Sequence, residues 1–204
     1  MIAIPYMVFE PAKTEYRALK TIRTRGRVSN GFAPSDIEIY TPGNDRVSAF
    51  RFNPLELLPG IEPDEHIENV LCSFEAAMPM SGPLPALLRE ALEEVYDAYP
   101  DRERPPVIAD LVSTAETVLA GKGYSADTNS DIRTALSVRV GVLSRGLIGR
   151  VFQCRRSVPS IAHLMAVPSI IEVAMLPPSQ ACLLGLFLFN GIREHLRAVA
   201  RGVQ

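Results

Sequence analysis

The chain begins with an almost uninterrupted apolar run, Ile2–Phe9 (IAIPYMVF). A strand with one solvated face alternates apolar and polar residues, whereas a continuous apolar run is typical of a strand buried on both faces of a parallel sheet. The run starts at the second residue, so its partner strands must come from later in the chain or from elsewhere. It therefore favours an α/β fold and suggests that the domain begins before this sequence.

Two further strands are expected, at Ile37–Tyr40 and Ser169–Leu176. Helical spacing of apolar residues, with Pro and Gly at the boundaries, predicts helices at 14–25, 64–78, 87–95, 107–120, 130–144, 160–165 and 179–200. Asp64 is the expected cap of the second of these helices, and the arginine-rich segment Arg145–Arg156 is expected to be a loop or ribbon. The element order predicts an α/β fold, a partial sheet of about three strands with a large helical insertion.

One partial domain over 1–204 accounts for this order. Residues 1–53 hold the first strands and a basic helix, residues 54–145 the helical insertion, and residues 146–204 an arginine-rich connection, a core strand and the C-terminal helix. The first half of that last helix, Ala181–Phe189, is apolar all round, so we expect it to be packed on both sides.

The composition, with 47% hydrophobic and 22% charged residues, is that of a soluble globular protein. Lys and Arg prevail in 1–28 and 133–204, while Asp and Glu prevail in 56–104. These regions are expected to pair within the fold or to leave a basic face for phosphates. The longest apolar stretch is far shorter than the roughly 20 residues that cross a bilayer, and no signal peptide is recognisable.

Cys72, Cys154 and Cys182 form no CxxC pair, so buried free thiols in a reducing, cytoplasmic compartment are expected. His66, His163 and His195 are isolated and predict no metal site. No GxxxxGK[ST] phosphate-binding loop occurs, and the nearest string, Gly121–Tyr124, follows a helix instead of a strand. No GxGxxG follows a strand, so a dinucleotide site is not predicted either.

Glu10 and Lys13 directly follow the first apolar run. The carboxyl ends of parallel strands are where ligands bind in open α/β sheets, so these two residues are candidates for a place near a nucleotide, its magnesium ion or its phosphates. The alternative is a helix start in which Thr14 is the cap and the two charges form a surface pair.

Arg145, Arg150, Arg155 and Arg156 place four guanidinium groups in one short segment. Arg binds phosphate through two parallel hydrogen bonds, so the group is a candidate for an arginine finger acting on a neighbouring subunit or for contacts to a DNA backbone. The alternative is that these arginines neutralise the acidic helices of the insertion.

The run VFEPAKTEYRAL resembles the segment after the P-loop helix in HerA-type ATPases, and the apolar strand with Asp-Pro-Lys of FtsK-type DNA translocases. The resemblance continues through IYTPGNDRVSAFRFNPLELLPGI, through GYSADTNSDIRTALSVRVGVLSRGLIGRVFQCRRSVPS and through PSIIEVAMLPPSQACLLGLFLFNGIREHLR, so it covers nearly the whole chain. Glu10 and Lys13 match the Asp-Pro-Lys region, with Glu in place of Asp and Ala12 inserted.

The resemblance implies a RecA-like motor domain that works as a hexameric ring on double-stranded DNA with ATP and Mg²⁺. It places the phosphate-binding loop (Walker A) before Ile2 and the acidic strand (Walker B) after the last helix, so this chain alone is not expected to hydrolyse ATP. Ser169–Leu176 lacks the paired acidic residues of that second motif and is expected to be an ordinary core strand. The expected partners of the whole chain are the missing ATPase segments, or ring subunits of its own kind.

Two other functions remain open. One is a non-enzymatic adaptor that docks on a complete ATPase through the helical insertion. The other is a nucleic-acid-binding module that uses the region Arg145–Arg156.

Overall fold

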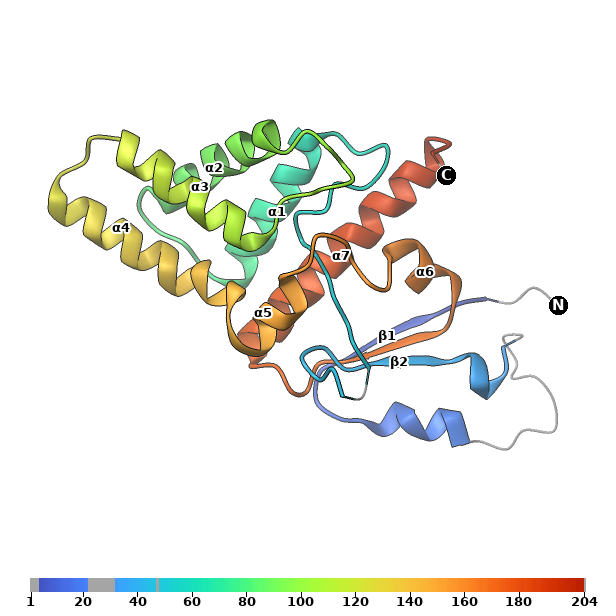
Figure 1. Ribbon diagram of the computed structural model, residues 1–204. Helices are drawn as coiled ribbons and strands as arrows, with labels where there is room; N and C mark the ends of the chain where they lie inside the picture. Colours follow the sequence, from blue (N-terminus) through green and yellow to red (C-terminus); the bar gives the residue numbers. More distant parts are fainter. Residues whose placement is uncertain (1–3, 22–31, 47, 204) are drawn as a thin grey trace.

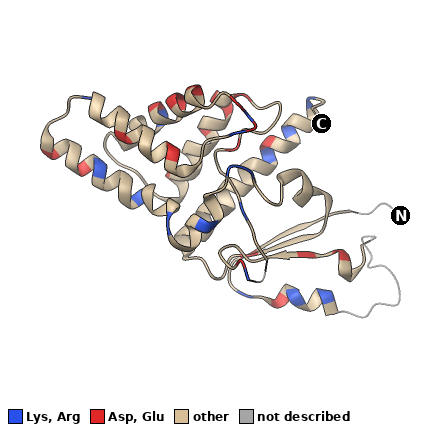
Figure 2. Ribbon diagram, in the orientation of Figure 1, with Lys and Arg blue, Asp and Glu red and all other residues tan. Residues whose placement is uncertain are grey.

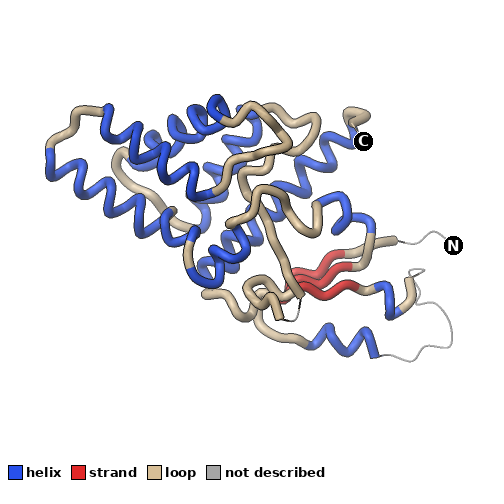
Figure 3. The backbone as a smooth tube through the Cα atoms, in the orientation of Figure 1, coloured by secondary structure: helices blue, strands red, loops and turns tan. Residues whose placement is uncertain are grey.

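The computed structural model describes residues 4–21, 32–46 and 48–203. Its sheet has three parallel strands, β1 (Met7–Glu10), β2 (Glu38–Tyr40) and β3 (Ser169–Glu172), in the order β1-β3-β2. The last strand in the sequence lies in the middle and is buried at all its positions (Figure 3). The fold-class prediction is confirmed: the protein is α/β, with a small parallel sheet and a large helical insertion.

The first and the third of the predicted strands are shorter than expected. In the first, Ile4–Tyr6 is not strand, because Pro5 lacks the N–H that a ladder needs, and residues 1–3 lie outside the described residues. In the third, the strand ends at Glu172, after which the chain turns and the N–H of Leu176 bonds to the carbonyl of Val173 at 2.9 Å.

The helical insertion consists of α1 (Pro63–Ala77), α2 (Leu84–Ala98), α3 (Ile108–Gly121), α4 (Ala126–Arg139) and the 3-10 turn η3 (Gly141–Ser144). In Figure 1 these helices form a layer of their own, in which α1 packs against the C-terminal helix α7 (Pro178–Ala200). Apolar side chains such as Phe74, Leu88 and Leu119 are fully buried between the helices.

Helix boundaries differ from the predictions where local chemistry decides them. Pro63 takes the first position of α1, where a missing N–H costs nothing, so Asp64 lies inside the helix and is not its cap. Ser125 caps α4 by accepting the Thr128 N–H at 3.3 Å, so that helix begins before residue 130 and ends at Arg139, ahead of η3.

The predicted helix at 14–25 is only partly described. Glu15–Thr21 forms the 3-10 helix η1 instead of an α-helix, and residues 22–25 lie outside the described residues. A second short 3-10 turn, η2 (Pro34–Asp36), leads into β2.

The segment predicted as an arginine-rich loop or ribbon contains a helix, α5 (Gly146–Phe152). The prediction was wrong because a short apolar face, with Ile148, Val151 and Phe152 fully buried, is hidden between the arginines. Gly149 makes this packing possible: a Cβ there would lie 2.6 Å from the backbone carbonyl carbon of Ser144, closer than any side chain allows.

Helix α7 runs past α1 on one side and past α6 (Ile161–Ala166) on another, and Phe9 of β1 lies over its Gly185. The prediction that its apolar half is packed on both sides was wrong. Leu183 and Leu184 are fully buried, but the Phe189 side chain is 72% exposed. The described helices and strands of the chain therefore bury only part of the surface of α7.

Figure 2 shows acidic residues on the helices of the insertion and basic residues on α7. The acidic middle pairs with the C-terminal basic region within the fold, which is one of the two alternatives predicted. Arg197 and Arg201 of α7 both pair with Glu65 of α1, and Arg156 pairs with Glu103. The three cysteines are free, but Cys72 and Cys182 are exposed and Cys154 is half-buried, so the expectation that all are buried was wrong. In the part of the chain that the structure describes, no helix has both the length and the apolar character of a membrane span.

Candidate functional site

The three parallel strands end side by side at Glu10, Tyr40 and Glu172, and this carboxyl edge of the sheet is the place where ligands bind in open α/β folds. Glu10 and Glu172 lie opposite each other in the register of β1 and β3. Thr41, directly after β2, is buried at the same edge. The edge is therefore rich in polar groups, although the strands themselves are apolar.

Glu172 is the most deeply buried of these groups, with only 1% of its side chain exposed. The Arg17 Nε lies 2.9 Å from both carboxylate oxygens of Glu172, and Nη2 donates to Oε2 at 2.6 Å. The Thr41 hydroxyl lies 3.4 Å from both groups. A buried carboxylate without such a partner would cost several kcal/mol, on the order of the desolvation of one ion. Arg17 thus ties η1 to the end of the central strand.

Sequence reasoning did not identify this pair. The sequence predicts Ser169–Leu176 as an ordinary core strand, yet a carboxylate within its apolar run SIIEVAML is a signal that Glu172 needs a buried partner. Nothing in the sequence named Arg17 as that partner, because the two residues are 155 positions apart.

The two predicted nucleotide-proximal residues lie at this edge but bond locally. The Glu10 carboxylate accepts the backbone N–H groups of Ala12 at 3.2 Å and Lys13 at 3.0 Å. The Lys13 ammonium pairs with Glu15 at 2.9 Å, with both side chains about two-thirds exposed to solvent. The expected surface pair between Glu10 and Lys13 is therefore not formed, because Glu10 binds the backbone of the turn and Lys13 pairs with Glu15.

The described residues at the edge do not by themselves fit a nucleotide with its magnesium ion. The carboxylates of Glu10 and Glu172 are already hydrogen-bonded, and Lys13 faces Glu15. No three His, Cys, Asp or Glu residues within the described ranges come together as a metal site. ATP and Mg²⁺ therefore stay expectations.

The four arginines of the segment Arg145–Arg156 divide into two pairs. Arg155 donates to the Pro105 carbonyl at 2.8 Å, lies 3.5 Å from Asp110 and stacks over the Tyr99 ring. Arg156 pairs with Glu56 and Glu103. Both arginines pair with carboxylates of the insertion and its flanks, and Arg155 also donates to a backbone carbonyl there.

All four arginines are exposed, but the side chains of Arg145 and Arg150, in contrast to the other two, form no hydrogen bond or ion pair with any residue that the structure describes. The structure thus separates two arginines that pair with groups of the fold from two that have no partner among the described residues.

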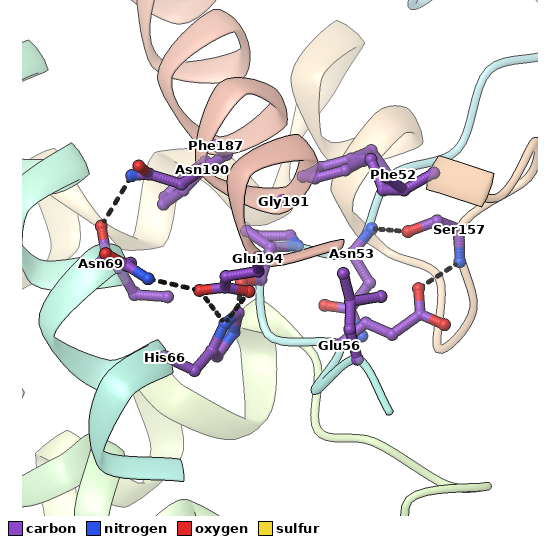
Figure 4. A pocket seen from close by; sticks show the side chains of 14 residues that line it. Phe52, Asn53, Glu56, His66, Asn69, Ser157, Phe187, Asn190, Gly191 and Glu194 are labelled. Atoms are coloured by element: carbon purple, nitrogen blue, oxygen red, sulfur yellow. Dashed lines mark hydrogen bonds and ion pairs between the residues drawn. The ribbon is translucent and has the colours of Figure 1, made fainter. Parts of the chain in front are cut away.

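A second polar cluster lies between α1 and α7, away from the sheet edge (Figure 4). The buried Glu194 carboxylate contacts His66 Nδ1 at 2.9 Å and accepts from the Asn69 amide at 2.6 Å, while His66 Nε2 lies 3.1 Å from the Pro54 carbonyl. The cavity beside these groups has a volume of about 20 Å³. That space holds about one water molecule and no nucleotide, so the cluster fastens the insertion to α7.

An apolar groove of about 430 Å³ lies where β1 meets α7, lined by Met7, Phe9, Gly185, Leu186, Phe189 and Ile192. The outer edge of β1 borders it. Tyr6 and Glu10 direct their carbonyls to β3, so the intervening Met7 and Phe9 direct their N–H and C=O groups to the other side. No strand within the described residues pairs with that edge.

The fold is similar to that of a known protein. A solved structure of VirB4 of Thermoanaerobacter pseudethanolicus matches with a TM-score of 0.52 and 16% sequence identity, over 92% of this chain and 69% of that chain. No protein-family model and no curated protein matches the sequence. At this identity the likeness shows a shared fold alone.

Proposed function

We propose that this chain is a segment of a HerA-like, DNA-translocating ATPase. It supplies part of the motor's sheet together with the helical insertion. The observation that carries the proposal is the fold shared with VirB4 over 92% of the chain. The resemblance of the run VFEPAKTEYRAL and the later segments to HerA- and FtsK-type ATPases supports the same family from the sequence.

The open edge of β1 supports the view that the motor is completed by other strands. The unpaired N–H and C=O groups of Met7 and Phe9 lie next to an apolar groove, and an exposed strand edge of this kind pairs readily with a further strand. Those strands and the phosphate-binding loop would come from missing ATPase segments or from ring subunits. ATP and Mg²⁺ bind the completed motor, double-stranded DNA is its substrate, and the cytoplasm is its location.

Alone, the chain does not turn over ATP in this proposal, because no GxxxxGK[ST] loop is present to hold the phosphates. Nucleotide binding by the purified chain, followed by fluorescence of a labelled ATP with and without Mg²⁺, tests this point. The expected result is no magnesium-dependent binding and no phosphate release. Magnesium-dependent affinity or turnover by the isolated chain contradicts it.

The coding DNA on both sides of this reading frame tests the family. A phosphate-binding loop encoded upstream and an apolar strand ending in paired acidic residues downstream are expected. The longer chain that includes both should then hydrolyse ATP faster when double-stranded DNA is added. Flanking DNA that encodes neither element, in any frame, overturns the assignment.

A further inference from the structure

Two arginines of the segment Arg145–Arg156 are available for a ligand, and α5 fixes where they lie. Leu147, which lies between them on α5, packs against the turn that follows β2: its Cβ is 3.5 Å from the position a Cβ would take at Gly43. The same turn is closed by the Asn44 N–H bonding to the Thr41 carbonyl at 2.9 Å. Leu147 thus holds α5 against the turn that follows β2, with Arg145 directly before the helix and Arg150 in its last turn.

The turn brings a third cation to this place. Arg46 is exposed, and its side chain has no ion-pair partner among the described residues. The nearby acidic group, Asp45, is already occupied, because both its oxygens accept from Arg51, at 2.7 Å and 2.8 Å. The pKa of Asp45 is lowered by Arg51 first and also by the charge of Arg150, so Arg150 lies within electrostatic reach of this turn.

The balance of charge at this place is positive. Asp45 offsets Arg51, which leaves Arg46, Arg145 and Arg150 without a carboxylate partner in the described part of the chain. Three exposed guanidinium groups on two neighbouring segments suit an extended row of phosphates, since each guanidinium can donate two parallel hydrogen bonds to one phosphate.

We propose that Arg46, Arg145 and Arg150 form a binding face for the phosphates of double-stranded DNA, and that Arg155 and Arg156 take no part in it. The identity of the ligand rests on the proposed function, whereas the division of the arginines rests on the contacts of the structure. We expect this face to bind DNA without base-sequence specificity, because contacts to phosphates position a protein on DNA without distinguishing bases.

The test is binding of a fluorescently labelled DNA duplex of arbitrary sequence to the full chain, measured by anisotropy between about 50 and 200 mM salt. The variant Arg145→Gln/Arg150→Gln removes two exposed cations of the face. The matched control, Arg104→Gln/Arg133→Gln, removes two exposed arginines that also lack an ion-pair partner among the described residues but belong to other segments. Both variants change the net charge equally, and circular dichroism verifies that each is folded.

Each phosphate contact that is lost lowers the slope of log affinity against log salt by ~0.9, so the first variant should lose a slope of about 1.8 and the control almost none. Arg155→Gln/Arg156→Gln should keep the slope of the wild-type chain. Equal slopes for the first variant and the control overturn the proposal, as does the absence of binding at the lowest salt.

Inorganic triphosphate is the second probe, because phosphate could also come from a nucleotide. Binding of triphosphate at micromolar concentrations by a chain that binds no duplex overturns the assignment to DNA. A failure of the arginine face leaves the ATPase proposal intact, since that proposal is decided by the flanking coding DNA and by nucleotide turnover.

Discussion

The Arg17 guanidinium bridges η1 to the buried carboxylate of Glu172, with Nε 2.9 Å from both oxygens and Nη2 2.6 Å from one of them. The two partners differ in environment, because 45% of the Arg17 side chain is exposed and only 1% of the Glu172 side chain is. The consequences of losing each partner therefore differ as well.

Arg17→Ala should destabilise the protein more than Glu172→Gln does. The first change leaves a buried carboxylate with only the distant Thr41 hydroxyl, at a cost of about 3 kcal/mol, whereas the second leaves a neutral amide beside a solvated cation and costs about 1 kcal/mol. Urea unfolding followed by circular dichroism measures both. Lys13→Ala, at an exposed pair, is the control and should change the free energy of unfolding by less than about 0.5 kcal/mol. The reverse order of the two variants would show that Arg17 does not neutralise Glu172.

The purified chain should self-associate at tens of micromolar, on the order of the concentrations at which exposed strand edges and apolar surface aggregate. The open edge of β1 and the groove containing Leu186 and the exposed Phe189 provide the surface. Phe189→Lys should shift the light-scattering mass toward the monomer. Val138→Lys, which changes a similarly exposed residue on α4, should have no such effect. A monomeric wild-type chain at these concentrations contradicts the prediction.

The three thiols should react at two different rates. Burial raises the pKa of Cys154 to about 12, whereas Cys72 and Cys182 are exposed. Because the thiolate is the reactive form, an aromatic disulfide reagent near pH 8 should label Cys72 and Cys182 first and Cys154 slowly. Peptide mass spectrometry assigns the sites. Labelling of Cys154 at the rate of the other two would mean that the segment after α5 opens readily.

The contact between α1 and α7 should weaken in acid. The hydrogen bond from Arg197 and the charge of Arg201 hold the pKa of Glu65 below its usual value, so this pair stabilises the fold above the unfolded-state pKa of roughly 4.3 and loses its contribution as the pH falls below it. The stability measured by thermal unfolding should therefore fall less steeply between pH 6 and pH 3 for Glu65→Gln than for the wild type. The difference should amount to about 0.5 kcal/mol, because the pair is partly solvated. Parallel curves would assign the acid sensitivity to other carboxylates.

The sequence by itself determined the class of the fold. The apolar runs at Ile2–Phe9 and Ser169–Leu176 and the helical spacing between them depend only on neighbouring residues, so they predicted a parallel sheet with a helical insertion. Local signals also located most helices, although Pro63 and Ser125 moved the starts of two of them and the helix predicted at 130–144 ends at Arg139.

Only the tertiary structure decided which charges are used and which are free. The four arginines of Arg145–Arg156 look alike in the sequence, yet packing around α5 turns Arg155 and Arg156 toward Pro105, Glu56 and Glu103 and leaves Arg145 and Arg150 in solvent. The same holds for Arg17 and Glu172, and for the exposed side of α7. Partners of this kind are set by contacts between residues far apart in the chain, and no pattern along the sequence records them.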